Sequence, residues 1–410
     1  MKKRLFWGLV MSVFTALLLS GCSKNANNKK VTLELFSNKS EAVGTYQKLI
    51  KEFEQENPDI EVKLTTPPDA ETVMKTRLTK NDIPDMFAMS GNGTFGELAR
   101  AGVFADFSGN QNLEKVRPVY IDSLEKVVGP TKKGTYGIPY TPNANIVIYN
   151  KDRLKELNGT VPQTWNEFVA LLKKAKAAKI TPIYWTLNEP WTDQSPWNSL
   201  EANLVSQNFA KLENEGKTSF VKTHQKVAKK MLTLINYGHS DNFGKGYSDG
   251  NTAIGKGDSL FYFQGNWAIP EVLKATPKAN IGVFPLPTSN VPGKTKLASA
   301  VDIVLTMSVK TKHEKEVKKF INFMMRKENA QTFIDDQLAF STIKGVDQNN
   351  EILSGIKPYF ADDRITAVMD SYYPQGMGTA SLIQEFLQKK NTNAFLKKLD
   401  SEWAKTLDHQ

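Results

Sequence analysis

Apolar and polar residues follow one another along this chain with two different periods. Residues 31–37 and 60–66 have the length and the composition of short strands. Between them, residues 41–58 carry apolar side chains every three or four positions, which predicts an amphipathic helix. A helix over residues 71–80 and a strand over residues 85–90 are predicted next. This alternation of strands and helices is typical of a parallel sheet covered by helices.

The alternation continues toward the C-terminus. Residues 91–102 are expected to form a loop that leads into another helix. Residues 160–179 predict a helix with a capping box, in which Thr164 is the N-cap and Glu167 lies three positions later. Further predicted elements are strands over residues 180–187 and 302–309, and helices over residues 313–337 and 380–407. Since 410 residues are too many for one hydrophobic core, we expect two α/β lobes.

The first 22 residues have the features of an export signal. Basic residues precede an apolar run over residues 5–19, which is shorter than the roughly twenty residues that a membrane-spanning helix needs. Small residues then precede Cys22, and this arrangement resembles the lipobox of bacterial lipoproteins. We therefore expect a signal peptide over residues 1–21. The alternative is a permanent N-terminal membrane anchor.

Cys22 is the only cysteine of the chain, so it cannot form an internal disulfide. The resemblance to a lipobox implies that cleavage exposes this cysteine and that acyl chains such as palmitate are attached to it. Several acyl chains, each methylene contributing about 0.8 kcal/mol, would hold the protein firmly on the membrane surface. Residues 22–30 then form the lipidated cysteine and a short polar tether.

The positive charge of the chain is distributed rather than concentrated. The formal net charge is +10, and Lys2, Lys3 and Arg4 of the leader account for three of these charges. The remaining lysines are scattered along predicted helices, as in residues 171–179 and 313–320. Nucleic-acid binding proteins instead concentrate basic residues in a patch or a block. The sequence therefore does not predict a nucleic-acid partner.

No motif for catalysis or for a cofactor is present in the sequence. The four histidines are far apart, and neither an HExxH motif nor a nucleophile elbow occurs. Residues 250–257 approach the pattern of a phosphate-binding loop, but Gly257 stands where that loop needs serine or threonine. We therefore expect no metal, no cofactor and no enzymatic activity. The histidines are His224, His239, His313 and His409.

Four segments, in this order, resemble the extracellular solute-binding proteins of ABC importers for oligosaccharides, the family that includes maltose-binding protein. The segments are YGIPYTPNANIVIYNKD (136–152), VPQTWNEF (161–168), GNTAIGKGDSLFYFQGNWAI (250–269) and IGVFPLP (281–287). Within this family, the chain is most similar to the raffinose-type, multiple-sugar lipoproteins of Gram-positive bacteria. The resemblance implies the extracellular face of the cell membrane as the location.

The resemblance also implies an architecture and partners. It implies two α/β lobes of the periplasmic-binding-protein type, with a ligand cleft between lobes that are joined by crossover hinge segments. We expect the N-terminal lobe over residues 31–143 and about 301–354, and the C-terminal lobe over residues 144–300 and about 355–410. The partners implied are an oligosaccharide and the transmembrane subunits of an ABC permease, and the protein is expected to be a monomer.

The segment around Asn143 is expected to cross from one lobe to the other. The resemblance implies that residues 144–152 begin the first strand of the second lobe and that Asn143 faces the sugar. Maltose-binding protein has a glutamate at the matching position, which sets this chain apart from a maltodextrin binder. The alternative role of Asn143 is a turn-forming asparagine beside proline.

Three tryptophans lie close together between residues 185 and 197. Flat rings suit the C–H faces of sugars, and carboxylates and amides suit their hydroxyl groups. The sequence NEPW at residues 188–191 resembles the place where maltose-binding protein uses a glutamate and an aromatic residue. We expect ligand contacts from Trp185, Asn188, Glu189 and Trp191, and a core position for Trp197.

Trp267 is the strongest single candidate for a sugar contact. Family members carry Gly-x-Trp at this place, and the tryptophan stacks on a sugar ring. The alternative is a tryptophan buried in the core. Gln264, which lies three residues earlier, is a neutral side chain suited to hydroxyl groups.

Candidates from the first lobe and from the late crossings are polar. Asn38 and Glu41 follow the first predicted strand, and Asn92 follows a later one, at the carboxyl ends where open α/β sheets bind ligands. Helix capping is the alternative role for Asn38. Asp302 and Gln375 are expected near the later crossings.

Taken together, these residues predict a lipoprotein that captures a neutral oligosaccharide, such as a raffinose-type or fructo-oligosaccharide, and delivers it to a permease. Two alternatives remain open at the level of the sequence. The first is an exported glycoside hydrolase, which needs a pair of carboxyl groups around the scissile bond. The second is a binding protein for a solute other than a sugar.

Overall fold

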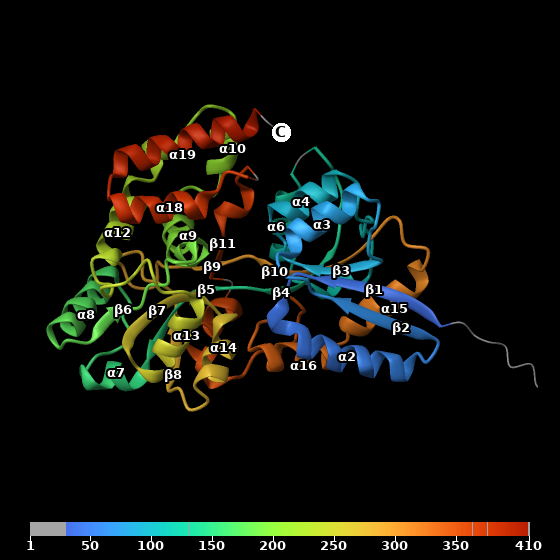
Figure 1. Ribbon diagram of the computed structural model, residues 1–410, viewed down its shortest axis with the longest axis horizontal. Coiled ribbons are helices and arrows are strands. Elements are labelled where there is room, and N and C mark those ends of the chain that lie inside the picture. Colours follow the sequence, from blue (N-terminus) through green and yellow to red (C-terminus); the bar gives the residue numbers. More distant parts are fainter. Residues whose placement is uncertain (1–29, 130, 363, 375, 409–410) are drawn as a thin grey trace, which may run out of the picture.

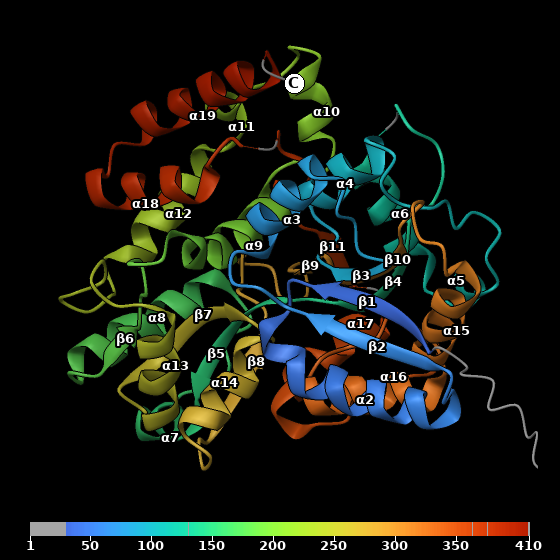
Figure 2. The same cartoon turned by 45° about the vertical axis from the view of Figure 1, so that its right-hand side comes forward.

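The computed structural model describes residues 30–408 except residues 130, 363 and 375. Figure 1 shows two α/β lobes, each built on its own sheet, and Figure 2 shows the same lobes after a turn of 45°. The predicted export signal, Cys22, nearly all of the tether and Gln375 lie outside the described residues. In the part of the chain that is described, no helix is both long and apolar enough to cross a membrane.

The sheet of the first lobe joins strands from two distant parts of the sequence. Its strand order is β2-β1-β3-β10-β4, with β1 parallel to β2 and β3, and β10 antiparallel to β3 and β4. The predicted parallel sheet is therefore confirmed for three strands. The strands are β1 (Val31–Ser37), β2 (Ile60–Thr65), β3 (Met86–Met89), β4 (Ile138–Pro142) and β10 (Val301–Met307).

Helices cover both faces of this sheet because its side chains alternate between the faces. In α2, Phe53 packs against Phe320 and Phe323 of α15, with ring centroids 5.1 and 5.4 Å apart. These apolar contacts hold α15, which comes late in the sequence, against α2, which comes early. The helices of this lobe are α2 (Val43–Glu56), α3 (Ala70–Thr79), α4 (Gly93–Arg100), α5 (Asn112–Lys115), α6 (Pro118–Val128), α15 (Glu314–Met324) and α16 (Lys327–Gln337), with the short helix η1 (Ser40–Ala42) before α2.

The second lobe has a four-stranded sheet with the order β6-β7-β5-β8. In this sheet, β5 is antiparallel to β7 and β8, and β6 is parallel to β7. Phe168 of α8 packs on Phe261 of β7, with the ring centroids 5.0 Å apart. The strands are β5 (Asn145–Asn150), β6 (Thr181–Ile183), β7 (Ser259–Gly265) and β8 (Ile281–Phe284).

The helices of the second lobe come from the middle and the end of the chain (Figure 1). They are α7 (Lys151–Glu156), α8 (Trp165–Ala177), η2 (Pro190–Asp193), α9 (Gln194–Leu204), α10 (Phe209–Asn214), α11 (Phe220–Thr223), α12 (Gln225–Ile235), α13 (Tyr247–Lys256), α14 (Ala268–Ala275), α18 (Thr379–Lys389) and α19 (Thr392–Leu407). The capping box predicted for α8 is confirmed, because the Thr164 side chain accepts from the Glu167 backbone and the Glu167 carboxylate accepts from the Thr164 backbone.

The chain crosses between the lobes at Asn143, where β4 of the first sheet ends and β5 of the second begins. A returning segment runs beside it. The Asn143 amide N–H donates to the carbonyl of Ala300 (2.9 Å), and the Asn143 Oδ1 accepts from the Ala300 N–H (2.9 Å). Further connecting elements are β9 (Leu297–Ser299), its parallel partner β11 (Ile365–Ala367), η3 (Glu351–Gly355), α17 (Lys357–Ala361) and η4 (Met369–Tyr372).

Four expectations about element boundaries are wrong. The predicted loop 91–102 contains α4, whose N-cap Asn92 accepts from the Phe95 N–H at 3.3 Å. The helix expected over 313–337 is two helices, because Arg326 has an extended backbone between them. The helical end 380–407 is likewise divided.

The division of the C-terminal helices has a local cause. Lys390 adopts a left-handed backbone conformation with φ 57°, which ends α18. Asn391 then caps α19 by accepting from the Ala394 N–H at 3.1 Å. The strand expected over 180–187 is also shorter than predicted and ends at Ile183.

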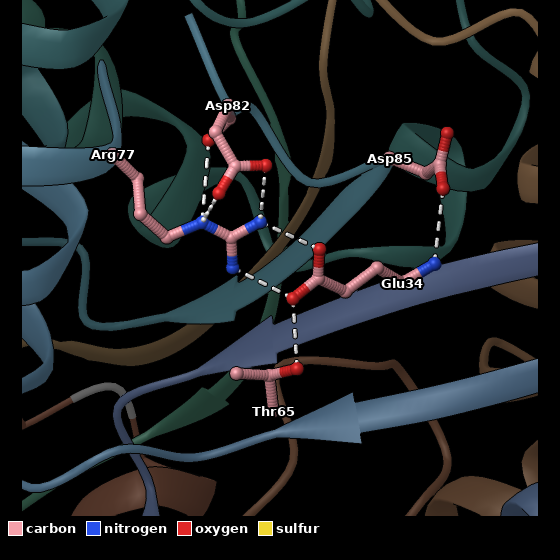
Figure 3. Close-up of polar contacts among 5 residues, drawn as sticks. All are labelled: Glu34, Thr65, Arg77, Asp82 and Asp85. Carbon is pink, nitrogen blue, oxygen red and sulfur yellow. Dashed lines mark hydrogen bonds and ion pairs between the residues drawn. The ribbon is translucent and has the colours of Figure 1, made fainter. Parts of the chain in front are cut away.

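A network of charged residues fastens α3 to the first sheet (Figure 3). The Arg77 guanidinium donates to both carboxylate oxygens of Glu34 at 2.7 Å, and it also pairs with Asp82 at 2.9 Å. Thr65 of β2 donates to Glu34 at 2.8 Å. The hydrogen bonds from Arg77 lower the pKa of Glu34. The network therefore connects α3 with β1 and β2, and the bidentate ion pair between Arg77 and Glu34 is its centre.

Candidate functional site

Two aromatic rings of the second lobe are held in place by one carboxylate. Glu189 Oε2 accepts from the Trp191 indole N–H at 3.0 Å, and Glu189 Oε1 accepts from the Tyr247 backbone N–H at 2.8 Å. The Trp191 side chain is 38% exposed, and its ring centroid lies 5.1 Å from that of Tyr247. We call this group, formed by Glu189, Trp191 and Tyr247, the aromatic corner.

The Glu189 carboxylate lies beside the N-terminus of α13, although Glu189 itself precedes η2. Tyr247 is the first residue of α13, and the amide groups at a helix N-terminus favour a negative charge. A side chain at Gly246 would begin 2.8 Å from Glu189 Oε1, so the backbone approaches the carboxylate closely there. Both oxygens of Glu189 thus have donors inside the protein.

Trp267 lies at the start of the neighbouring helix α14 and is half-buried. A Cβ atom at Gly265 would lie only 1.9 Å from the Trp267 ring, so the ring rests directly on the backbone at the end of β7. Glycine is required at this position by close approach of a ring, not by backbone conformation. Any side chain there would displace the tryptophan.

The first lobe contributes charged groups at the end of β1. Lys39 and Asp302 form an ion pair of 2.6 Å, and both side chains are mostly buried. Glu41 is open to solvent, yet protein atoms surround it closely enough for desolvation to raise its pKa. Glu271 of α14, in the second lobe, and Asp302 add to this rise by repulsion, and Lys39 opposes it. Carboxylates of the two lobes therefore share one electrostatic environment.

Tyr247 connects the aromatic corner with this acidic group. Desolvation raises the pKa of the Tyr247 hydroxyl, and the charges of Glu271, Glu41 and Glu189 raise it further. The hydroxyl is therefore neutral at physiological pH and can both donate and accept a hydrogen bond. Tyr247 and Glu271 were not predicted from the sequence. Tyr247 lies in the glycine-rich segment 244–250 and does not follow a predicted strand. The rule that ligand contacts lie at the carboxyl ends of strands therefore did not select it.

Three predicted ligand contacts have partners inside the protein. Trp185 is 2% exposed and packs on Phe263, with ring centroids 5.4 Å apart. Gln264 is buried and donates to the Tyr262 hydroxyl at 3.1 Å. Asn143 uses its side-chain oxygen in the crossing. This placement gives no support to ligand contacts from these three side chains. Trp197 is buried in the core, as predicted.

The remaining candidates lie at the edges of the two lobes. Asn38 and Ser90 exchange hydrogen bonds of 3.2 and 3.3 Å at the carboxyl ends of β1 and β3. Asn92 caps α4. Asn188 is exposed next to the aromatic corner. The structure thus brings Glu41 and Asp302 together on one lobe and Glu189 and Trp191 together on the other, while Asn38 and Asn92 have local structural partners.

Residues of η4 contact both lobes, Asp370 through α9 of the second lobe and Tyr372 through α6 of the first. Asp370 Oδ2 accepts from Asn198 at 2.9 Å and from Gln194 at 3.2 Å, both on α9. Desolvation raises the pKa of Asp370 to about 6. Two residues later, the Tyr372 hydroxyl lies 3.5 Å from the Ser123 hydroxyl of α6. Among the described residues, no group of His, Cys, Asp and Glu could hold a metal ion.

Comparison with known proteins agrees with this arrangement. Residues 37–331 match the family described as bacterial extracellular solute-binding protein. The chain is 34% identical to the multiple sugar-binding protein of Streptococcus mutans over 363 residues, which are 85% of each chain. It is 24% identical to the melibiose/raffinose/stachyose-binding protein of Bacillus subtilis, over 88% of this chain and 86% of that one.

Solved structures are similar over nearly the full length. The solute-binding protein RafE in complex with raffinose superposes with a TM-score of 0.80 at 27% identity, covering 92% of this chain and all of that one. The apo form of RafE from Streptococcus pneumoniae gives a TM-score of 0.77 at 27% identity, covering 92% of this chain and 98% of that one.

Proposed function

Because this chain belongs to the bacterial extracellular solute-binding proteins, which bind solutes rather than transform them, we propose that it captures a neutral oligosaccharide outside the cell and delivers it to an ABC permease. The names of its relatives support a sugar of the raffinose or multiple-sugar type. The observation that carries the proposal is the aromatic corner. The charges of Glu41 from the first lobe and Glu271 from the second both act on its Tyr247 hydroxyl.

The chemistry of these groups suits a sugar. The rings of Trp191 and Trp267 offer flat apolar surface to C–H faces, and the Tyr247 hydroxyl and Glu41 carboxylate offer hydrogen bonds to hydroxyl groups. The ammonium group of Lys39 is already paired with Asp302. An anionic ligand would meet the negative charges of Glu41, Glu189 and Glu271 there, so a neutral ligand is favoured.

The two lobes support a closing mechanism. A sugar bound to the rings of the second lobe gains further contacts from Glu41 of the first lobe when the lobes approach. A ligand favours the closed state to the extent that it makes more contacts there. The permease subunits then recognise the closed form. We propose a first lobe of residues 31–143 and about 301–354 and a second lobe of residues 144–300 and about 355–410, a division supported by the strands that each sheet contains.

Calorimetric titration with a panel of sugars tests the proposal. Raffinose, stachyose, melibiose and a fructo-oligosaccharide form the panel, with a polyamine and a peptide as non-sugar ligands. We expect at least one oligosaccharide to bind saturably and to quench tryptophan fluorescence. Binding of the polyamine or the peptide alone, with no sugar bound, would contradict the assignment.

The anchoring proposal concerns Cys22 and a Gram-positive cell surface. Cys22→Ala removes the acylated sulfur, so the variant is expected in the growth medium rather than in the membrane fraction. Cys22→Ser keeps nearly the size of cysteine but also lacks the thiol, so it is expected to behave as Cys22→Ala does. A variant that remains in the membrane fraction at the wild-type level would show that the leader itself is the anchor.

A further inference from the structure

A pocket of about 430 Å³ lies apart from the aromatic corner. One wall is β8, the edge strand of the second sheet, together with Tyr149 and the loop that contains Gln163. The other wall is η3 and α17, the segment that follows α16 of the first lobe. None of the residues of the aromatic corner lines it, and neither does Trp267.

Two close backbone contacts fix the walls of this pocket. A Cβ atom at Gly355 would lie 2.0 Å from the Val283 carbonyl oxygen, so η3 lies directly on β8. A Cβ atom at Gly282 would lie 2.7 Å from the Tyr149 ring, so that ring covers the strand. The pocket is therefore part of the folded framework rather than a gap between loosely packed side chains.

The charges that line the pocket have one sign. Lys151 and Arg364 line it, and no carboxylate is among the described residues that do. Within the described part of the chain, the Lys151 ammonium group has no ion-pair or hydrogen-bond partner, although its backbone N–H donates to Asn280. An unpaired ammonium group beside a cavity attracts a negatively charged group.

Three acids that lie close in sequence to the lining residues have partners. Asp362 pairs with Arg364 at 3.4 Å, while the Arg364 guanidinium also lies 4.2 Å from the centroid of the Tyr359 ring. The Glu167 carboxylate accepts from the backbone N–H groups of the capping box. Asp152 accepts from the Asn280 side chain at 2.8 Å. None of these carboxylates is directed to Lys151 by a hydrogen bond or ion pair.

We propose that this pocket binds a small soluble oxyanion with two or more carboxylate or phosphate groups. Lys151 supplies the charge without a competing partner, and Arg364 supplies a second cation that is held in place by Tyr359. The side chains of Gln163 and Ser354 add neutral hydrogen-bonding groups. The volume fits a molecule of the size of citrate or pyrophosphate, not a polymer. This site is separate from the sugar site and does not depend on the proposed function.

Thermal unfolding and calorimetry with citrate and pyrophosphate test the site on the mature chain. Sodium chloride at the same ionic strength is the control for screening of surface charge. We expect a saturable rise of the melting temperature with at least one of the two anions, and no such rise with chloride. If only citrate or only pyrophosphate binds, the site is specific for carboxylate or for phosphate.

A pair of variants on α7 makes the test specific. Lys151→Gln removes the charge at the pocket, whereas Lys155→Gln removes the same charge from an exposed position on the same helix that does not line it. We expect Lys151→Gln to weaken anion binding about tenfold and Lys155→Gln to leave it nearly unchanged. Equal effects of the two variants, or no anion-specific binding at all, would overturn the proposal. Raffinose titration of both variants reports separately on the sugar site.

Discussion

Two carboxylates of the first lobe and two of the second have different kinds of partner. In the first lobe, Glu34 pairs with Arg77 and Asp302 pairs with Lys39, so each acid faces a cation. In the second lobe, Glu189 and Asp370 accept from neutral donors, namely an indole, a backbone amide and side-chain amides. The first pair of acids therefore fastens strands and helices of the first lobe through cations. The second pair positions an aromatic ring and a connecting segment through neutral donors.

This difference predicts that the rings of the second lobe supply most of the affinity for sugar. Trp267→Ala removes a half-buried ring, and we expect a loss of about 1 to 3 kcal/mol in binding free energy with a nearly unchanged melting temperature. Trp197→Ala is the matched control. Because Trp197 is fully buried, its truncation costs about 3 to 5 kcal/mol of unfolding free energy.

Calorimetry and thermal unfolding of both tryptophan variants decide the first prediction. If Trp267→Ala lowers the melting temperature as much as Trp197→Ala does and leaves affinity unchanged, Trp267 belongs to the core. The site would then consist of the aromatic corner alone.

The ion pairs of the first lobe are expected to affect stability and not affinity. Arg77→Ala leaves Glu34 without its cation in a partly buried position, so we expect a loss of about 1 to 3 kcal/mol of unfolding free energy. Arg326→Ala breaks an exposed pair with Glu56 and should cost less than about 1 kcal/mol. Chemical denaturation measures the unfolding free energy of both variants. A fall of sugar affinity in Arg77→Ala would contradict the expectation that this ion pair affects stability alone.

The aromatic corner allows a sharper test of the neutral donors. Glu189→Gln replaces one carboxylate oxygen by an NH2 group, which donates but does not accept. Either the Trp191 indole N–H or the Tyr247 backbone N–H therefore loses its acceptor. We expect a loss of about 1 kcal/mol in sugar affinity, with stability changed by a similar amount or less. Glu271→Gln neutralises a neighbouring acid that holds no ring and is expected to retain affinity. If the two variants behave alike in calorimetry, Glu189 acts through its charge and not through the corner.

The smallest expected effect is the response of stability to pH. The pKa of Glu34 is lowered, so its contribution is present above its unfolded pKa and is lost as the pH falls. The pKa of Asp370 is raised from 3.8 to about 6, so its contribution is present below pH 4 and is lost as the pH rises toward 6. The two trends act in different windows: Glu34 affects stability below about pH 4.5, whereas Asp370 makes the wild type less stable as the pH rises from 4 to 6.

Asp370→Asn removes one of these two trends. Its unfolding free energy should fall less between pH 4 and 6 than that of the wild type, because Asp370 no longer titrates while Glu213, whose pKa is raised to about 7, still does. Denaturation curves at several pH values measure both slopes. A variant profile with the same slope as that of the wild type would show that Asp370 does not titrate there.

The sequence predicted the architecture better than it predicted the site. The capping box of α8 depends on a local pattern and was predictable from a few neighbouring residues, whereas the crossing at Asn143 was implied by the resemblance to a family. Asn391 also caps a helix, but the lysines before it continue the helical pattern of 380–407 and concealed the break. Tyr247 reaches Glu189 across 58 positions of the chain, and such a contact has no local signal. Trp185 and Trp191 look alike in the sequence, and only packing against Phe263 distinguishes the buried ring from the exposed one.

The pairing of Asn143 with Ala300 has a mechanical consequence. The two crossing segments are joined there by a backbone and a side-chain hydrogen bond, so we expect them to bend together rather than independently. In a biosensor built from this protein, a substitution at Asn143 is therefore expected to change how easily the lobes move while leaving the aromatic corner intact.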